Sequence, residues 1–361
     1  VGQSARPDEL RAPDLAPGEV VRVVDDAHLI GLGVSDAELG DVGEGRRVGH
    51  GGGVGGGRRW TERRAFVKAP EFPYTPRVLP LPIRLLSDAH IGACPPAAEA
   101  SLLSHLRALR GAPGSLVLNG DILDFWFEWR RSVPAFALPV LGAIAELRAS
   151  GMPILWLAGN HDCWGGDVLR RTIGVEYVEG PVRLRAGAWD LEVYHGDGLR
   201  GDADRRYRAM KRVLRHPWSI AAFRWLHPDL GTRLALGTSS VSRNTMHAVD
   251  EGAGLRDAAF ARLASPDGPT LVVYGHSHVP GIDRAPGGGV YANPGAWAEA
   301  PRWLEIDATR VALRERRASG EVHDLDVAEC GAEKALPDPE YGLGGVGGDD
   351  PVPGRGAVRR E

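Results

Sequence analysis

Histidine, aspartate and asparagine side chains recur at the ends of short apolar runs in this sequence, where together they could hold metal ions. They stand in five segments: SDAHIG with Asp88 and His90, NGD with Asp121, GNHD with Asn160, His161 and Asp162, HGDG with His195, and GHSH with His276 and His278. Imidazole and carboxylate ligands without a thiolate suit manganese, iron, zinc or cobalt. Two neighbouring cations are the common apparatus for hydrolysing phosphate esters. The set therefore predicts a two-metal phosphoesterase site.

Taken singly, each of these residues is more simply explained as a turn residue or a buried structural side chain. This explanation does not suit the set as a whole, because five of the 12 histidines fall at the ends of the apolar runs. His276 and His278 are one residue apart, so in an extended segment they point to the same side and could serve two metals, with Asp121 as a bridge. Glycines that let the backbone turn sharply beside a phosphate stand at positions 120, 159, 196 and 275.

The elements that must position these side chains are short buried strands alternating with helices. Apolar runs predict strands over residues 83–87, 115–119, 153–158, 190–195, 270–274 and 289–293. Helical spacing predicts helices over 97–109 and 134–150. This alternation favours an α/β fold, in which ligands bind at the carboxyl ends of the strands.

Composition places the folded part in the middle of the chain. Residues 40–57 contain 10 glycines, and nine of the ten tryptophans lie between positions 126 and 303. We expect a disordered Gly/Pro/Arg-rich extension over 1–78, one domain over 79–330, and a disordered tail over 331–361.

Charge and cysteine content limit the functional classes. The 361 residues carry a net charge of -4, which argues against a nucleic-acid partner. The three cysteines are too few for a disulfide framework and favour a reducing compartment. Neither a signal peptide nor an apolar run of about 18 residues is evident. We expect a cytoplasmic protein, and association with the inner face of a membrane stays open.

A basic segment separates the HGDG and GHSH motifs. Between positions 200 and 245 it has 10 Arg or Lys against 3 Asp, interleaved with apolar residues. The simpler interpretation is a pair of helices with solvated arginines. The alternative is a helical lid over about 200–250, which holds phosphates and an acyl chain or aromatic base, or which rests on an anionic membrane. Its candidate substrate-binding residues are Arg205, Arg208, Lys211, Arg212, Arg243 and Asn244.

The five motifs, DAH, GD, GNHD, HGD and GHSH, resemble the calcineurin-like metallophosphoesterase superfamily in type and order. The resemblance implies a β-sandwich flanked by helices and a bridging hydroxide that attacks phosphorus. It assigns His161 to phosphate binding and leaving-group protonation, with Asp162 orienting it, and it gives Asn160 a catalytic role beside the metals in stabilising charge on the phosphoryl oxygens. One implied metal set is Asp88, His90, Asp121 and His278. The other is Asp121, Asn160, His195 and His276.

A narrower resemblance is to the UDP-2,3-diacylglucosamine hydrolases of lipid A synthesis. It rests on GDILDFWFEW, on DADRRYRAMKRVL after HGDG, and on SSVSRN. It implies cleavage of a pyrophosphate or phosphodiester bond in a small phosphorylated or lipid-linked substrate, with two divalent ions, manganese being expected and iron, zinc or cobalt the alternatives. Those enzymes typically carry Arg where this chain has His161. Other interpretations are a general phosphodiesterase, a dinucleotide polyphosphate hydrolase and a non-catalytic scaffold.

Overall fold

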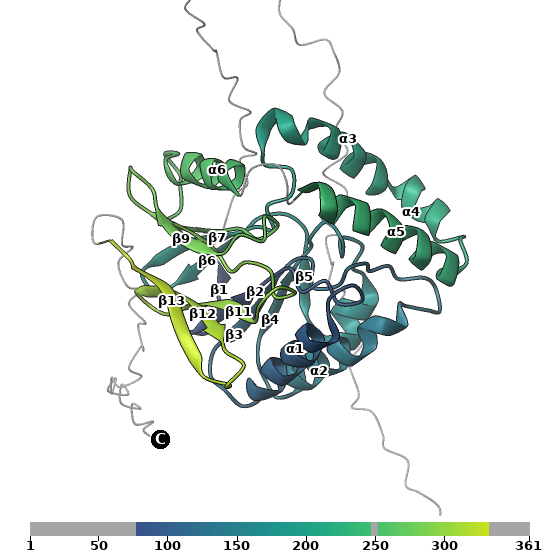
Figure 1. The fold of residues 1–361 in the computed structure, drawn as a ribbon, viewed down its shortest axis with the longest axis horizontal. Coiled ribbons are helices and arrows are strands. Elements are labelled where there is room, and N and C mark those ends of the chain that lie inside the picture. Colours follow the sequence, from purple (N-terminus) through teal and green to yellow (C-terminus); the bar gives the residue numbers. More distant parts are fainter. Residues whose placement is uncertain (1–76, 247–251, 332–361) are drawn as a thin grey trace, which may run out of the picture. The chain divides into compact units, whose positions relative to one another are not determined.

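The computed structural model describes residues 77–246 and 252–331, and these residues form two stacked β-sheets with helices on their outer faces (Figure 1). The expected α/β sandwich is therefore confirmed. The segments 1–76 and 332–361, for which we expect disorder, lie outside the described residues. The side chains of Arg243 and Asn244 lie outside the described part as well.

The larger sheet has seven strands in the order β13-β12-β11-β2-β3-β4-β5. In that order the strands are Val322–Glu329, Arg310–Arg316, Arg302–Ile306, Ile83–Leu86, Ser115–Asn119, Ile154–Leu157 and Glu176–Val178. β2 to β5 pair in parallel, and the other pairs are antiparallel. β2, β3 and β4 are mostly buried on both faces, which explains their continuous apolar sequences.

The smaller sheet has six strands in the order β1-β6-β7-β8-β10-β9. In that order the strands are Arg77–Val78, Val182–Ala186, Trp189–Val193, Leu271–Val273, Val290–Asn293 and Gly281–Arg284. β7, β8 and β10 are parallel neighbours in its centre. Side chains from both sheets, such as Leu85 and Leu191, form one apolar core between the layers.

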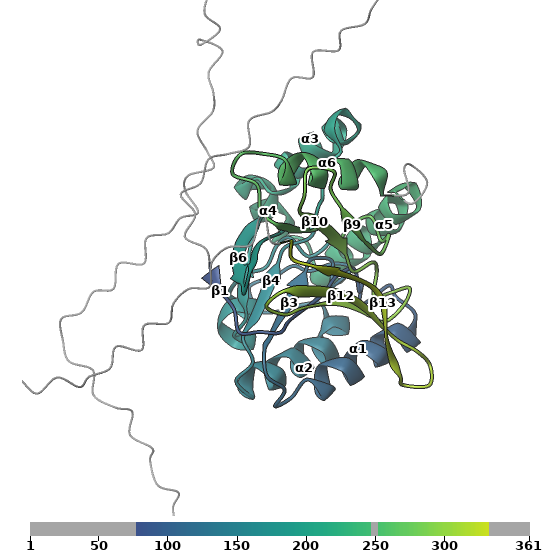
Figure 2. The same ribbon diagram turned by 90° about the vertical axis from the view of Figure 1, so that its left-hand side faces the viewer.

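Helices cover the outer face of each sheet, so the layers run helix, sheet, sheet, helix (Figure 2). α1 (Pro96–Ala108) and α2 (Leu138–Ala149) cover the larger sheet, and α6 (Ala253–Leu263) covers the smaller one. The segment between β7 and α6 contributes α3 (Arg205–Leu214), α4 (Pro217–Phe223) and α5 (Pro228–Met246). Three single-turn elements complete the set: Ala135–Ala137, Val168–Ile173 and Gly201–Asp204.

The structure confirms the expected strands and both helices, with ends that shift by up to two residues except at the start of α2. That helix begins at Leu138, after the single turn Ala135–Ala137, and not at residue 134. One expected boundary is wrong. Arg77 and Val78 belong to β1, which pairs with Leu184 and Arg185 of β6, so the folded domain begins before residue 79. The extension predicted from composition therefore ends too late, because a two-residue edge strand carries no pattern that the sequence could reveal.

Candidate metal centre

Five loops meet at the carboxyl ends of strands from both sheets. Three follow the parallel strands β2, β3 and β4, and two follow the parallel strands β7 and β8. The amide of Asp88 donates to the carbonyl of Gly120 (3.1 Å), and the amide of Gly275 donates to the carbonyl of His195 (2.9 Å). Parallel neighbours end at the same edge of a sheet, so the predicted residues come together there.

The backbone at this edge adopts a conformation that side chains normally avoid. Five described non-glycine residues have positive φ, between +46° and +62°, and they are Asp88, His90, Asp121, His276 and His278. All five are predicted ligands. Such conformations persist only where the surrounding structure enforces them, and they cluster at functional sites.

Three of the predicted glycines leave room for ligand side chains. A β-carbon at Gly120 would run into the ring of His195, and one at Gly159 would run into the carboxylate of Asp121. At Gly275 it would meet the carboxylate of Asp88. These glycines therefore permit close approach of backbone to ligands, in addition to turning the chain.

The first ligand group consists of Asp88, His90 and His278, whose ligand atoms all lie within 4.8 Å of one another. The Nε2 atoms of His90 and His278 are 3.3 Å apart, and Nε2 of His278 is 3.3 Å from Oδ1 of Asp88. The other ring nitrogens face acidic side chains: Nδ1 of His90 is 3.0 Å from Oδ1 of Asp124, and Nδ1 of His278 is 3.5 Å from Oε1 of Glu299. A carboxylate on Nδ1 fixes the tautomer and leaves Nε2 available as a ligand.

The second group consists of Asp121, His195 and His276. Nε2 of His195 lies 3.2 Å from Oδ2 of Asp121 and 3.2 Å from Oδ1 of Asn160. Its Nδ1 donates to the carbonyl of Asn119 (2.9 Å), so Nε2 again faces the centre. A third overlapping group, His90, Asp121 and His161, joins the two, with Asp121 at the junction.

The residues present fit a pair of cations. Nε2 of His276 is buried without a hydrogen-bond partner among the described residues, and Oδ1 of Asp88 is buried with ion-pair contacts to His90 and His278 but no hydrogen bond. A buried polar atom without a hydrogen bond is costly, and a cation in each group would satisfy the atom that lies there. Oxygen and imidazole donors without a thiolate match divalent first-row ions.

Electrostatics favour cation binding. Burial alone would raise the pKa of Asp88, but the adjacent His278 holds that pKa at about 2. Burial would lower the pKa of His195, yet Asp121 raises it to about 10; Asp88 raises that of His278 to about 10 in the same way. Burial and His195 lower the pKa of His276 to about 4. The carboxylates are thus ionised, and cations that enter must displace protons from two of the imidazoles.

His161 stands beside Asp121, with Nε2 3.8 Å from Oδ2 of that residue. Its Nδ1 donates to the carbonyl of Asp124 (3.0 Å) and lies 3.6 Å from the Asp124 carboxylate. The expectation that Asp162 orients this ring is wrong. The buried carboxylate of Asp162 instead accepts hydrogen bonds from the indole of Trp156 and from the amides of residues 121, 122, 123 and 159, so it shapes the loops.

Asp124 is therefore a residue that the sequence analysis missed. It is 1% exposed and contacts the rings of both His90 and His161. The sequence does show a second aspartate three residues after Asp121, in GDILD. Its residue type alone does not reveal which histidine rings it contacts.

The predicted substrate-binding residues of the basic insert lie in different environments. Lys211 donates to Asp197 and to the hydroxyl of Tyr194, and Arg208 donates to the carbonyls of residues 198 and 201. Arg205 and Arg212 are exposed. Arg215, which was not predicted, reaches the GNHD segment, where it donates to the carbonyl of residue 159 (3.2 Å).

Comparison with known proteins agrees with a metal-dependent phosphoesterase site. Residues 81–280 match the calcineurin-like phosphoesterase family, and the chain belongs to this family. The expected class, a metal-dependent phosphoesterase, is thereby confirmed. Among curated relatives, a UDP-2,3-diacylglucosamine hydrolase from Porphyromonas gingivalis is 32% identical over 45% of this chain and 64% of its own length. One of the same name from Sodalis glossinidius is 25% identical over 64% of this chain and 96% of its own length.

Solved structures add less. A dimetal phosphatase from Danio rerio is 12% identical, with a TM-score of 0.37, over 71% of this chain and all (100%) of that one. The likeness is too distant to carry an argument about the site.

Proposed function

We propose that this protein is a two-metal phosphohydrolase that cleaves a pyrophosphate or phosphodiester bond in a UDP-diacylglucosamine-like substrate. The observation that carries this proposal is the convergence of ligand side chains from five loops into overlapping groups, in which Nε2 of His276 is buried without a hydrogen-bond partner among the described residues. The substrate class is supported by the similarity to the two UDP-2,3-diacylglucosamine hydrolases described above.

Each residue would have a defined part. Asp88, His90 and His278 would hold one cation, and Asp121, Asn160, His195 and His276 the other, with Asp121 shared. Bound divalent ions, of which manganese is expected, supply a nucleophilic hydroxide at neutral pH and positive charge for the phosphoryl oxygens. His161 keeps a proton on Nδ1, because a carbonyl oxygen only accepts there. It can therefore donate from Nε2 to a leaving group only when the ring is doubly protonated.

The test is Asp121→Asn, assayed with Mn²⁺ against UDP-diacylglucosamine, bis-p-nitrophenyl phosphate and diadenosine tetraphosphate in parallel. We expect a loss of at least about 10³ in rate, because the shared carboxylate that holds both ions is gone. Asp257→Asn, an exposed aspartate on α6, is the matched control. Near-normal turnover by Asp121→Asn would contradict the site assignment. Preference of the native protein for the diester or the dinucleotide would favour the two enzyme alternatives.

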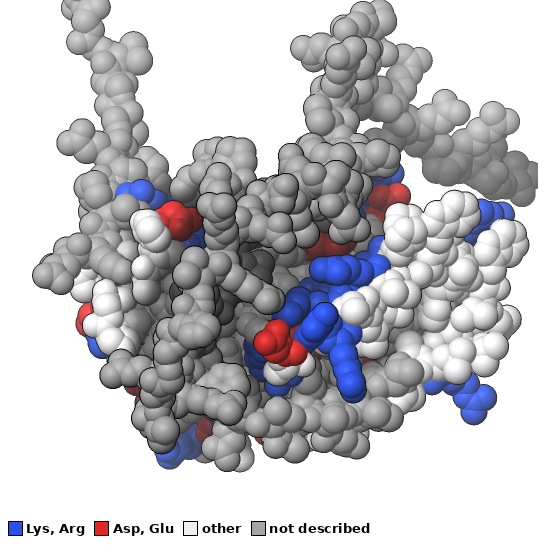
Figure 3. Space-filling model, turned by 90° about the horizontal axis from the view of Figure 1, so that it is seen from above, with Lys and Arg blue, Asp and Glu red and all other residues white. Residues whose placement is uncertain are grey.

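The insert offers a surface suited to a lipid-linked substrate. Exposed apolar side chains gather on α3, α4 and α5 and on the turn between α4 and α5, and they are Met210, Val213, Leu214, Trp218, Trp225, Leu230 and Leu234. Figure 3 shows uncharged surface on this part of the molecule beside a group of Lys and Arg side chains. Exposed tryptophans next to basic groups suit an anionic lipid surface. In the described residues, no helix is long and apolar enough to cross a bilayer.

We therefore propose that the insert rests on an anionic membrane, where a lipid-linked substrate is presented. Trp218 and Trp225 are 80% and 84% exposed. Changing both to Ser should reduce cosedimentation with phosphatidylglycerol vesicles while leaving hydrolysis of a water-soluble diester intact. Equal vesicle binding by the variant and the native protein would refute the membrane role.

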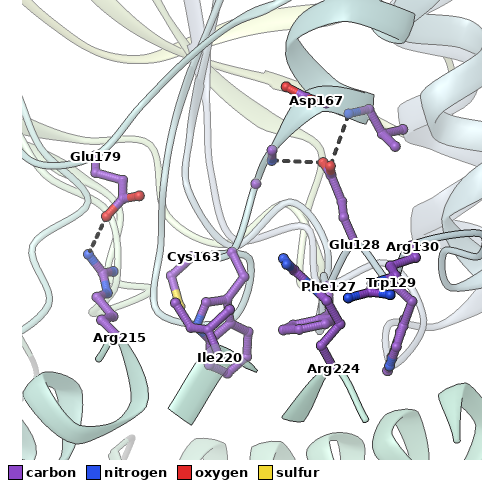
Figure 4. Close-up of a pocket in the computed structure, with 14 residues that line it drawn as sticks. Phe127, Glu128, Trp129, Arg130, Cys163, Asp167, Glu179, Arg215, Ile220 and Arg224 are labelled. Carbon is purple, nitrogen blue, oxygen red and sulfur yellow. Dashed lines mark hydrogen bonds and ion pairs between the residues drawn. The ribbon is translucent and has the colours of Figure 1, made fainter. Parts of the chain in front are cut away.

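A cavity of about 550 Å³ lies between the insert and the segment that follows Asp162 (Figure 4). Aromatic side chains and arginines share its lining, among them Phe127, Trp164, Arg215 and Arg224. Its volume is within the usual range for small-molecule sites, roughly 300–1,000 Å³. We propose that it receives the acyl or aromatic part of the substrate.

A further inference from the structure

The middle of α3 is attached to the loop that carries His195. Asp197, two residues beyond this ligand, is 2% exposed, and its Oδ2 accepts from the hydroxyl of Tyr207 (2.7 Å) and from Nζ of Lys211 (2.5 Å). Lys211 also donates to the hydroxyl of Tyr194 (3.1 Å), directly before His195. A carboxylate and an ammonium group thus meet at low exposure, in a contact of the kind that is costly to break.

The carboxyl end of the same helix is attached to a second ligand loop. Arg215, the residue that caps α3, donates from one guanidinium nitrogen to the carbonyl of Gly159 (3.2 Å) and faces Glu179 with another (3.5 Å). Figure 4 shows Arg215 directed at Glu179, beside the side chain of Cys163. Gly159 immediately precedes Asn160, so the contact fixes the backbone next to a predicted ligand.

The two attachments serve one ligand group. Nε2 of His195 and Oδ1 of Asn160 are 3.2 Å apart, although they come from different sheets. Ligands must be held within about 0.5 Å of their working geometry, and residues at the rear of a site provide this. The ring of Tyr207 also lies near that of His276, at 6.5 Å between centroids. α3 therefore spans the second group from one ligand loop to the other.

We propose that α3 is a brace for the second metal position, and that Lys211 and Arg215 are positioning residues that hold the His195 and Asn160 loops in register. The inference rests on the two-metal site proposed above. It assigns Lys211 a positioning role in place of the expected role in substrate binding, because two of the three N–H groups of its ammonium already have oxygen partners. A helix that merely docked on the surface would leave ion affinity unchanged when its contacts are removed.

The experiment measures Mn²⁺ affinity of the full chain by titration calorimetry in Lys211→Met, Arg215→Met and the double variant. We expect one binding step to weaken by about tenfold in each single variant, the lower end of the effect seen for residues that orient metal ligands, and the other step to stay within twofold. Arg215→Lys should recover part of the affinity, because an ammonium group can still donate to the Gly159 carbonyl. Arg206→Met, an exposed arginine on the same helix, is the matched control.

Limited cleavage by chymotrypsin, scored only at its aromatic sites because the added Met residues are weaker targets of the same protease, reports on the insert itself. We expect faster cleavage within residues 200–246 in the Met variants, since loosened helices open more often. Faster cleavage with unaltered Mn²⁺ affinity would overturn the brace, because the contacts would then hold only the insert. Equality with Arg206→Met in both measurements would overturn it too.

The same titration separates this inference from the proposed function. Fewer than two Mn²⁺ ions bound by the native protein would contradict the two-metal assignment. The proposal about α3 is then tested on the one remaining Mn²⁺ binding step. Weaker binding in the Met variants would support it, and unchanged binding would overturn it.

Discussion

At the scale of single residues, the site depends on groups that hold ligands as well as on the ligands themselves. Three imidazoles are oriented by an oxygen on Nδ1, which comes from Asp124, Glu299 or the carbonyl of Asn119. Each leaves Nε2 directed at the centre. Because a neutral imidazole has one donor and one acceptor, these partners decide which nitrogen can bind a cation.

Asp124→Asn tests this orientation. We expect metal affinity or turnover to fall by about 10–100-fold, because the amide no longer provides a negative charge at Nδ1 of His90 and near the His161 ring. This is a smaller loss than that expected for Asp121→Asn, because Asp124 does not hold the ion. Calorimetry with Mn²⁺ and steady-state kinetics provide the measurement, and native-like values in both would show that the contacts are incidental.

His161→Arg separates the candidate substrates. A sugar or nucleoside alkoxide leaves poorly unless protonated, so a general acid contributes about 10²–10⁴ there. A phosphate monoester, with a second pKa of about 6, needs little such help. We expect His161→Arg to retain most pyrophosphate hydrolysis and to lose activity on diesters with alkyl leaving groups. Equal losses on both, at fixed Mn²⁺ and pH, would favour the general phosphodiesterase.

At the scale of elements, α1 contributes a titratable group to the apolar core. His105 is 2% exposed and lies between the rings of Trp297 and Trp303, at 5.0 and 4.7 Å between centroids. Burial, and then the positive charges of Arg316 and Arg84, lower its pKa from 6.5 to about 3. The folded protein therefore holds this ring neutral where the unfolded chain would protonate it.

The stability of the domain should depend on pH through this ring. A depressed folded-state pKa leaves stability intact above pH 6.5, and stability is lost as pH falls from 6.5 toward 3. As pH falls through that window, the free energy of unfolding of the native protein should decrease relative to that of His105→Phe. The decrease should be up to about 1.4 kcal/mol per pH unit. Denaturant unfolding at several pH values measures the difference. Parallel curves for the two proteins would show that His105 does not titrate in this way.

At the scale of the whole molecule, the described domain begins and ends with a β-strand. β1 pairs with β6 near its start, and β13 pairs with β12 near its end. The loops that carry the predicted ligands lie between these strands, so we expect the rest of the chain to be unnecessary for activity.

A protein consisting of residues 77–331 should therefore fold and keep full activity on a soluble substrate. Residues 79–330, which lack β1, provide the comparison, and we expect only a small loss of stability because both residues of β1 are exposed. Thermal unfolding and Mn²⁺-dependent turnover are the measurements. Inactivity of residues 77–331 beside an active full chain would assign a role to the flanking segments.

The sequence alone determined the ligand types, their order and the strands that precede them. Each motif is local, and a buried strand followed by Gly and a polar residue is visible without knowledge of its neighbours. The α/β class and both core helices followed from the same local periodicity.

Only the tertiary structure decided which side chains face one another. The roles of Asp124 and Arg215 depend on contacts with residues in other loops, and the displacement of Asp162 from His161 depends on which amides surround its carboxylate. The strands β1, β5, β6, β9, β11, β12 and β13 were not predicted, because each has partly exposed or charged positions that weaken its apolar signal. Pairing across a sheet is a non-local interaction, so no single segment of the sequence encodes it.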